Sequence, residues 1–529
     1  MSIKTYRAHL QSIKSFGETV DVKAKPVFRS SAIFPVFDNE NLKTRILYMG
    51  YWLLKRNIAE IGLLVTLRGY DGNILKRDSI NIDSSHAREI KVDELLKKIK
   101  HNGKEFLGSV ELEVFSTQDL VFPYPAFVVN YYNDWGSSVV HTTGRIYNDF
   151  EDLQNNEAMI VKECGFDILP GEKYDPFFSF INGHIEMESN VIEFEIVGEN
   201  GNIHTEQINF GKLGALETSV LRLKEFLPVD EVLDGSVGTV KIKHNFRGFF
   251  PRFVAGNFCT ETTALSITHS FYDNSQIKDE SAYWSNEYDT MLFDSVLFVP
   301  LFVEGDWYTE LKLYPIYSPS THTINLVFHD EHGYEIGRYD NYMVVSEDQS
   351  EYFSIDFKET IDKLNLDRSR VKGVYLVKHW KSKSGIPTRL KYGLNIGCRN
   401  LKYDLPTNIC FNSQISNIKT LDKKGTFKWL PIVNHAESIA IIENTSYIKK
   451  YDREANLVVS FYKTDSDETI KKDYSVPANG QIRIHMDDEL NNFLEGNSGW
   501  ITVESDNPFV KAWYFDFNES GIMGGDHSF

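Results

Sequence analysis

Short segments in which apolar and polar residues alternate dominate this chain. Four of them begin at a glycine and span residues 108–114, 238–243, 373–377 and 499–504. Alternation with a period of two is typical of a β-strand that buries one face. Four further runs with apolar residues at most positions, at 63–67, 192–196, 324–328 and 457–461, are each followed by a polar turn sequence. Because Asn, Asp and Gly adopt the backbone angles of tight turns at little cost, each run predicts a β-hairpin.

The same order of features recurs four times along the sequence. Each copy opens with an apolar residue before a proline, at Phe34-Pro35, Leu169-Pro170, Val299-Pro300 and Leu430-Pro431. These prolines are 135, 130 and 131 residues apart (170−35, 300−170, 431−300). After the hairpin, each copy has a short helical stretch, at 92–96, 223–227, 357–361 and 487–490. A period of this length is the size of a small domain, so the sequence predicts four tandem domains, 1–150, 151–285, 286–415 and 416–529.

The predicted fold class is all-β, with four antiparallel β-sandwich domains that each carry one short helical turn. The order of proline strand, hairpin, crossing turn and glycine-led strand resembles immunoglobulin-like and fibronectin-type-III-like modules of bacterial tandem-domain proteins. The Cys…Trp…Cys signature of true immunoglobulin domains is absent. A jelly roll is the alternative, because about 130 residues is generous for seven strands. A resemblance of fold implies no particular activity.

Charge and composition exclude some functions and leave others open. The 529 residues carry a formal net charge of −19, which disfavours binding to nucleic acids and docking on anionic membranes. No run of eighteen apolar residues is present, so membrane insertion is not expected. The N-terminus does not resemble a Sec signal peptide. We therefore expect a soluble, acidic protein that is cytoplasmic or exported without such a signal.

The four cysteines do not recur at equivalent positions of the copies, so no disulfide framework is expected. No motif for phosphate binding, nucleophilic catalysis or zinc proteolysis is present, and no cofactor is predicted. The cluster His329-Asp330-Glu331-His332 falls on a predicted hairpin turn, where Asp serves the geometry of the turn. Whether the chain is an enzyme is left open by the sequence, which favours a non-enzymatic protein.

Three histidines occupy related positions when the copies are aligned on their second proline. They are His141, His269 and His527, and the third copy has 399–403 in the aligned stretch. Imidazoles from equivalent positions could converge on a metal ion or line a polar ligand pocket if the domains close around one another. Alternatively, each histidine only bonds nearby backbone at the end of a strand. The metal, if any, is not specified by the sequence.

Aromatic residues beside polar ones are the second group of candidate site residues. They are Trp135, Tyr283, Trp284 and Trp307. Sugar-binding sandwiches use an aromatic platform flanked by carboxylates and amides, although most tryptophans in strands belong to the core.

The sequence thus favours a tandem β-sandwich scaffold or recognition protein whose partner is a glycan or a protein. The alternatives are a metal-binding or glycan-active enzyme that uses the repeat-related histidines, and a structural component of a virion or surface assembly.

Overall fold

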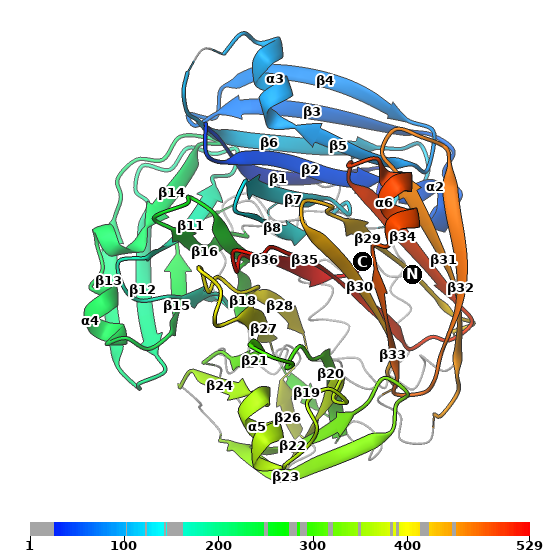
Figure 1. Cartoon of the computed structure of the whole chain (residues 1–529). Helices are drawn as coiled ribbons and strands as arrows, with labels where there is room; N and C mark the ends of the chain where they lie inside the picture. The colour runs from blue at the N-terminus through cyan, green and yellow to red at the C-terminus, as the bar shows by residue number, and fades with distance from the viewer. Residues whose placement is uncertain are drawn as a thin grey trace. The chain divides into compact units, whose positions relative to one another are not determined.

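A computed structural model of the protein describes residues 26–101, 103–121, 124–141, 144, 162–247, 252–273, 283–285, 294–315, 321–346, 351–380, 384–387, 391–412, 423–446 and 451–529. The described chain consists mainly of antiparallel β-sheets (Figure 1). The prediction of an all-β protein with antiparallel sandwich-like sheets is confirmed.

Four sets of eight strands follow one another along the chain. The first set contains β1 (Arg29–Asp38), β2 (Lys43–Met49), β3 (Ile61–Gly69), β4 (Ile74–Ile82), β5 (Ala87–Lys91), β6 (Phe106–Phe115), β7 (Val128–Asn133) and β8 (Gly136–His141). The second set contains β10 (Asp167–Ile168), β11 (Tyr174–Ile181), β12 (Val191–Gly198), β13 (Ile203–Asn209), β14 (Thr218–Arg222), β15 (Gly238–His244), β16 (Val254–Cys259) and β17 (Leu265–His269). Strands β9 (Lys162–Cys164) and β18 (Phe271–Asp273) extend one sheet of the second set.

The third and fourth sets repeat this plan. The third set contains β20 (Asp294–Pro300), β21 (Trp307–Leu313), β22 (His322–His329), β23 (Glu335–Val345), β24 (Phe353–Asp356), β25 (Gly373–Trp380), β27 (Lys391–Cys398) and β28 (Ile409–Asn412). The fourth set contains β29 (Thr426–Ile432), β30 (Glu437–Asn444), β31 (Ala455–Lys463), β32 (Thr469–Val476), β33 (Gln481–His485), β34 (Gly499–Ser505), β35 (Val510–Phe517) and β36 (Met523–His527). A separate two-stranded sheet pairs β19 (Tyr283–Ser285) with β26 (Ser384–Pro387).

All four sets share one strand order. Counted within a set, one sheet runs first–sixth–third–fourth and the other runs fifth–second–seventh–eighth. In the immunoglobulin constant domain the first two strands are neighbours in the same sheet, with order A-B-E-D. The resemblance to immunoglobulin-like modules therefore concerns the antiparallel two-sheet layout and does not extend to the strand order. The predicted hairpins are confirmed, because the third and fourth strands of every set are paired.

Short helices connect the fifth and sixth strands of each set. They are α3 (Val92–Lys98), η1 (Leu223–Glu225), α5 (Phe357–Lys363) and α6 (Asp488–Leu494). Asp356 and Asp487 are the N-cap residues that precede the last two helices, and each carboxylate accepts a backbone N–H of the first turn. Two further helices, α2 (Tyr51–Arg56) and α4 (Val229–Leu233), were not expected from the sequence. Among the described residues, no helix has the length and apolar character needed to cross a membrane.

Alternation of side chains along the strands produces the core of each set. In the second set, the apolar residues of β12 point between the two sheets, where Phe194 packs edge-on against Phe178 of β11 at 5.7 Å between ring centroids. The intervening residues Glu193 and Glu195 point to the other face of the sheet. Burial of such alternating apolar residues is the main stabilising contribution to a two-sheet fold.

The chain divides into two compact units, Met1–Asn274 and Ser275–Phe529. The first unit holds the first and second sets, and the second unit holds the third and fourth. The predicted boundaries of the four individual domains stay a prediction.

Within the first unit, the two sets meet through aromatic packing and hydrogen bonds. Phe37 packs edge-on against Phe177 and Phe258 of the second set at 6.5 and 6.0 Å. The Asn133 amide donates to the carbonyl oxygen of Thr262 at 2.8 Å. Strands β8 and β17 lie side by side, and the Ser138 hydroxyl on β8 donates to the Leu265 carbonyl on β17.

Within the second unit, one apolar cluster runs without interruption from the third set into the fourth. Phe302 of the third set packs against Phe515 and Phe517 of the fourth at 5.5 and 5.1 Å. Arg483 lies over the Phe302 ring and donates to the Leu301 carbonyl oxygen at 2.6 Å. An apolar interface of this kind makes the two sets pack as one body.

The same hairpin contact joins the two sets in both units. Gly72, in the turn between β3 and β4, lies so close to the second set that a Cβ would be 2.3 Å from the Ala215 carbonyl oxygen. Gly333, in the equivalent turn of the third set, would place a Cβ 2.0 Å from the Ala478 carbonyl oxygen. The equivalent Gly201 of the second set has no atom within 4 Å of its Cβ position. The glycine is thus required for docking only in the first and third sets.

Candidate functional site

Within the first unit, the structure brings together His141 and His269, which were singled out in the sequence. His141 is the last residue of β8 and His269 is the last residue of β17, and these strands are the eighth of the first and second sets. Because the two sets dock with β8 beside β17, their equivalent ends meet. The Nε2 atoms of His141 and His269 are 3.1 Å apart, and the ring planes are inclined by 88°.

The backbone fixes the orientation of His269. Its Nδ1 lies 2.8 Å from the carbonyl oxygen of Ser270, and its side chain is only 3% exposed. The Ser270 hydroxyl accepts the backbone N–H of Phe253, and the Ser270 N–H donates to the Phe253 carbonyl. His141, on the partly exposed side, therefore faces a ring whose position is set by the end of β17.

His527 lies in the second unit and has the same local geometry. It is the last residue of β36, the eighth strand of the fourth set, and its Nδ1 is 3.0 Å from the Ser528 carbonyl oxygen. Within this unit β36 contacts β28, the eighth strand of the third set. That strand ends at Asn412, so the third set supplies no histidine at this position.

The alignment of the third copy made from the sequence is therefore wrong. It placed 399–403 opposite the histidines, but Arg399 directly follows β27, the seventh strand, ahead of β28. Pro387 precedes the seventh strand as the second proline does in the other copies, but the third set has the longer connection 399–408 between its seventh and eighth strands, which delays β28.

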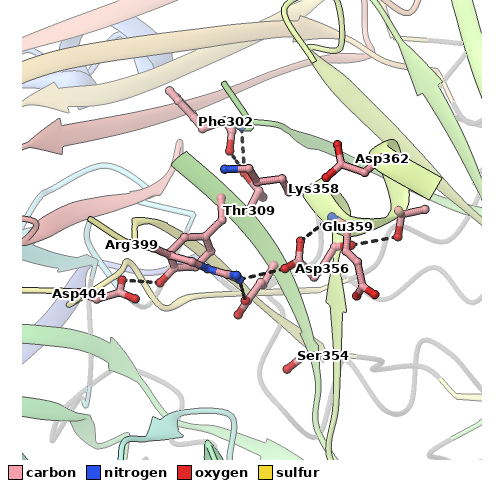
Figure 2. A network of polar contacts seen from close by, with 12 residues as sticks. Phe302, Thr309, Ser354, Asp356, Lys358, Glu359, Asp362, Arg399 and Asp404 are labelled. Atoms are coloured by element: carbon pink, nitrogen blue, oxygen red, sulfur yellow. Dashed lines mark hydrogen bonds and ion pairs between the residues drawn. The ribbon is translucent and has the colours of Figure 1, made fainter. Parts of the chain in front are cut away.

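Arg399 instead organises a polar cluster on the third set (Figure 2). Its guanidinium donates to the carboxylates of Glu310 and Asp356, both at 2.9 Å. Tyr308 lies under the guanidinium and donates to Asp404 at 2.6 Å. Burial is the main reason that the pKa of Tyr308 is well above its usual range. Since Asp356 also caps α5, the cluster connects the helix to the sheet.

The predicted aromatic candidates have different surroundings. Trp135 follows β7 and is 40% exposed. Trp307 packs against Phe517 at 4.9 Å and against Phe302, so its ring takes part in the contact between the third and fourth sets. Tyr283 and Trp284 form β19, and their side chains lie outside the described part of the chain.

The fourth set carries an open groove of about 660 Å³ that the sequence did not indicate. Cross-strand pairing aligns Phe427, Glu504, Val458 and Asp473 in one row across the outer face of the sheet β29–β34–β31–β32. Val458 is 40% exposed, and Glu504 and Asp473 are exposed as well. Directly after β34, Asp506 accepts hydrogen bonds from Asn456 and Arg453. The sequence signal that could have revealed this groove is an outward-facing apolar residue between acidic residues on the adjacent strands.

Two buried charges in the second unit were also missed. Glu443 is fully buried, opposite Lys511 on the neighbouring strand, and burial raises the pKa of Glu443 well above its usual range. Lys378 is fully buried between the apolar residues of β25, with its amine 5.2 Å from the centre of the Tyr392 ring. Burial lowers the pKa of Lys378 to about 7.

The remaining sequence expectations concern turns and thiols. The cluster 329–332 does form a turn, where the Asp330 carboxylate accepts the backbone N–H groups of His332 and Tyr334. Cys259, Cys398 and Cys410 are buried and unbridged. The chain matches no protein family and no curated protein.

Proposed function

We propose that this protein is a non-enzymatic recognition scaffold of four tandem β-sandwich domains, 1–150, 151–285, 286–415 and 416–529, that binds a glycan. The supporting observation is the groove on the fourth set. Its row combines an aromatic and an aliphatic side chain with two carboxylates, Glu504 and Asp473. A pyranose ring has an apolar face and polar edges, and therefore suits such a surface.

The edge strands argue against the alternative of assembly through strand edges. The fourth strand of each set lies at the edge of its sheet, and in β4 and β32 it carries adjacent charged residues, 76–78 and 471–473. Charges on edge strands discourage pairing with another chain. A glycan partner held on a sheet face is therefore favoured over a polymer built from strand edges.

A glycan-array screen of the full chain tests this proposal. We expect a binding glycan whose signal falls at least tenfold in F427A and is unchanged in I74A, which removes an exposed apolar side chain of the first unit. W135A tests the platform predicted from the sequence. Loss of binding in W135A with retention in F427A would transfer the site to Trp135, and absence of any glycan signal would contradict the proposal.

A further inference from the structure

The histidine pair of the first unit has a chemistry that the proposed function does not use. The carbonyl oxygen of Ser270 can only accept, so the Nδ1 of His269 at 2.8 Å must carry the proton and donate it. In the neutral ring, the Nε2 of His269 then presents a lone pair. This lone pair faces the Nε2 of His141 at 3.1 Å.

Two arrangements satisfy a lone pair in this position. In one, His141 is the tautomer protonated at Nε2 and donates a hydrogen bond to His269. In the other, both Nε2 atoms bind the same cation. A neutral imidazole nitrogen is the most common protein ligand for transition metals. The arrangement that orients such a ligand is a hydrogen bond from its other ring nitrogen to a carbonyl or carboxylate, as His269 has with Ser270.

The ring geometry favours the shared cation. The ring centroids are 4.5 Å apart, only 1.4 Å more than the Nε2 separation (4.5 − 3.1). Two rings meeting end to end would add both ring radii to the nitrogen separation, so these rings approach at an angle. A direct N–H···N bond is strongest when the donor points straight at the acceptor lone pair, and it weakens as the approach bends.

We propose that His141 and His269 bind one divalent transition-metal ion of the Zn²⁺ class between the first and second sets. Imidazole nitrogen suits Zn²⁺, Cu²⁺ and Ni²⁺, whereas Ca²⁺ and Mg²⁺ prefer oxygen ligands. The two ligands come from different sets, so the ion joins them at the ends of β8 and β17. A bound ion would stabilise the docked pair in proportion to its concentration and affinity.

Zinc titration of the chelator-treated full-length protein tests the proposal. Isothermal titration and elemental analysis after dialysis should give one Zn²⁺ per chain. This Zn²⁺ should be lost in H141A and in H269N, and retained in H184A, which removes an exposed histidine of the same unit. Ca²⁺ should not compete.

Circular dichroism establishes whether each variant is folded. If H269N does not fold, because His269 is buried, the H141A variant of the partly exposed His141 decides the test. If the wild-type protein holds no stoichiometric Zn²⁺, or if H141A retains it, the two rings share only a hydrogen bond and the proposal is wrong. Glycan binding is measured separately, so the failure of one proposal leaves the other intact.

Discussion

Replacing the turn glycine of the first set by alanine should weaken the docking of the first unit. Gly72 has φ +79° and Gly201 has φ +85°, so alanine costs about 1 kcal/mol of left-handed strain in either turn. Only at Gly72 does the new Cβ meet another set, at 2.3 Å from the Ala215 carbonyl oxygen. Ordinary contact begins at 3.4 Å, so the turn and the loop must separate by about 1.1 Å (3.4 − 2.3).

That separation acts on a hydrogen bond as well as on packing. The backbone N–H of Thr218 donates to the Tyr70 carbonyl at 2.8 Å beside the same turn. Forcing extra atoms into a packed contact costs about 1–3 kcal/mol. We therefore expect G72A to lose about 2–4 kcal/mol of unfolding free energy, whereas G201A loses about 1 kcal/mol.

Urea unfolding of the full chain, followed by circular dichroism and by protease sensitivity, measures this difference. G201A is the matched control in the same unit, and G333A repeats the test in the second unit, where the Cβ would be 2.0 Å from the Ala478 carbonyl oxygen. Equal losses in G72A and G201A would refute the docking role of the glycine. The whole effect would then be backbone strain.

Three further predictions concern buried charges and the histidine position. Because burial raises the pKa of Glu443, its uptake of a proton on folding should lower stability as pH rises above about 4.5, while the lowered pKa of its partner Lys511 acts in the opposite direction. Urea melts at pH 5 and 8 should therefore show a larger fall of stability with pH in the wild type than in E443Q, and an equal fall in both proteins would contradict this. Because burial lowers the pKa of Lys378 to about 7, this side chain releases a proton when the protein folds. Thermal melts should show that K378M stabilises the protein by roughly 1–3 kcal/mol, with a larger gain at pH 7 than at pH 9.5. An equal gain at both pH values would contradict this. If Asn412 is the third-set counterpart of His141, N412H should create a second zinc site with His527 and raise the zinc content from one ion to two per chain. R399H should leave the zinc content unchanged. The reverse result would support the alignment made from the sequence.

Much of the local structure could be predicted from residue patterns. The strand pattern at 457–461 and the polar turn sequence at 465–467 predicted the β31–β32 hairpin. The turn forms without a glycine because Asp465 adopts the positive φ of +53° that the turn requires. The turn at 329–332 was also predicted correctly, since Asp330 accepts the two backbone N–H groups of its turn. Such features depend on residues that are neighbours in the sequence, so the residue pattern of one chain is enough to predict them.

Contacts between sets could not be predicted in the same way. Gly72 and Gly201 stand in nearly identical turns, Asp-Gly-Asn and Asn-Gly-Asn, yet only Gly72 touches another set. His141 and His269 were found by aligning the copies, but their meeting depends on how β8 and β17 dock. The burial of Lys378 could have been predicted, because Val374, Leu376 and Trp380 on the same face of β25 are core residues.

The continuous apolar cluster of the second unit determines where this chain can be cut. A fragment that ended after the third set would expose Phe302 and Trp307, and a fragment of the fourth set alone would expose Ile441, Trp513 and Phe515. Exposed apolar surface of that extent promotes aggregation. The smallest fragment able to fold cleanly is therefore a pair of sets, and each pair should melt in a single cooperative step.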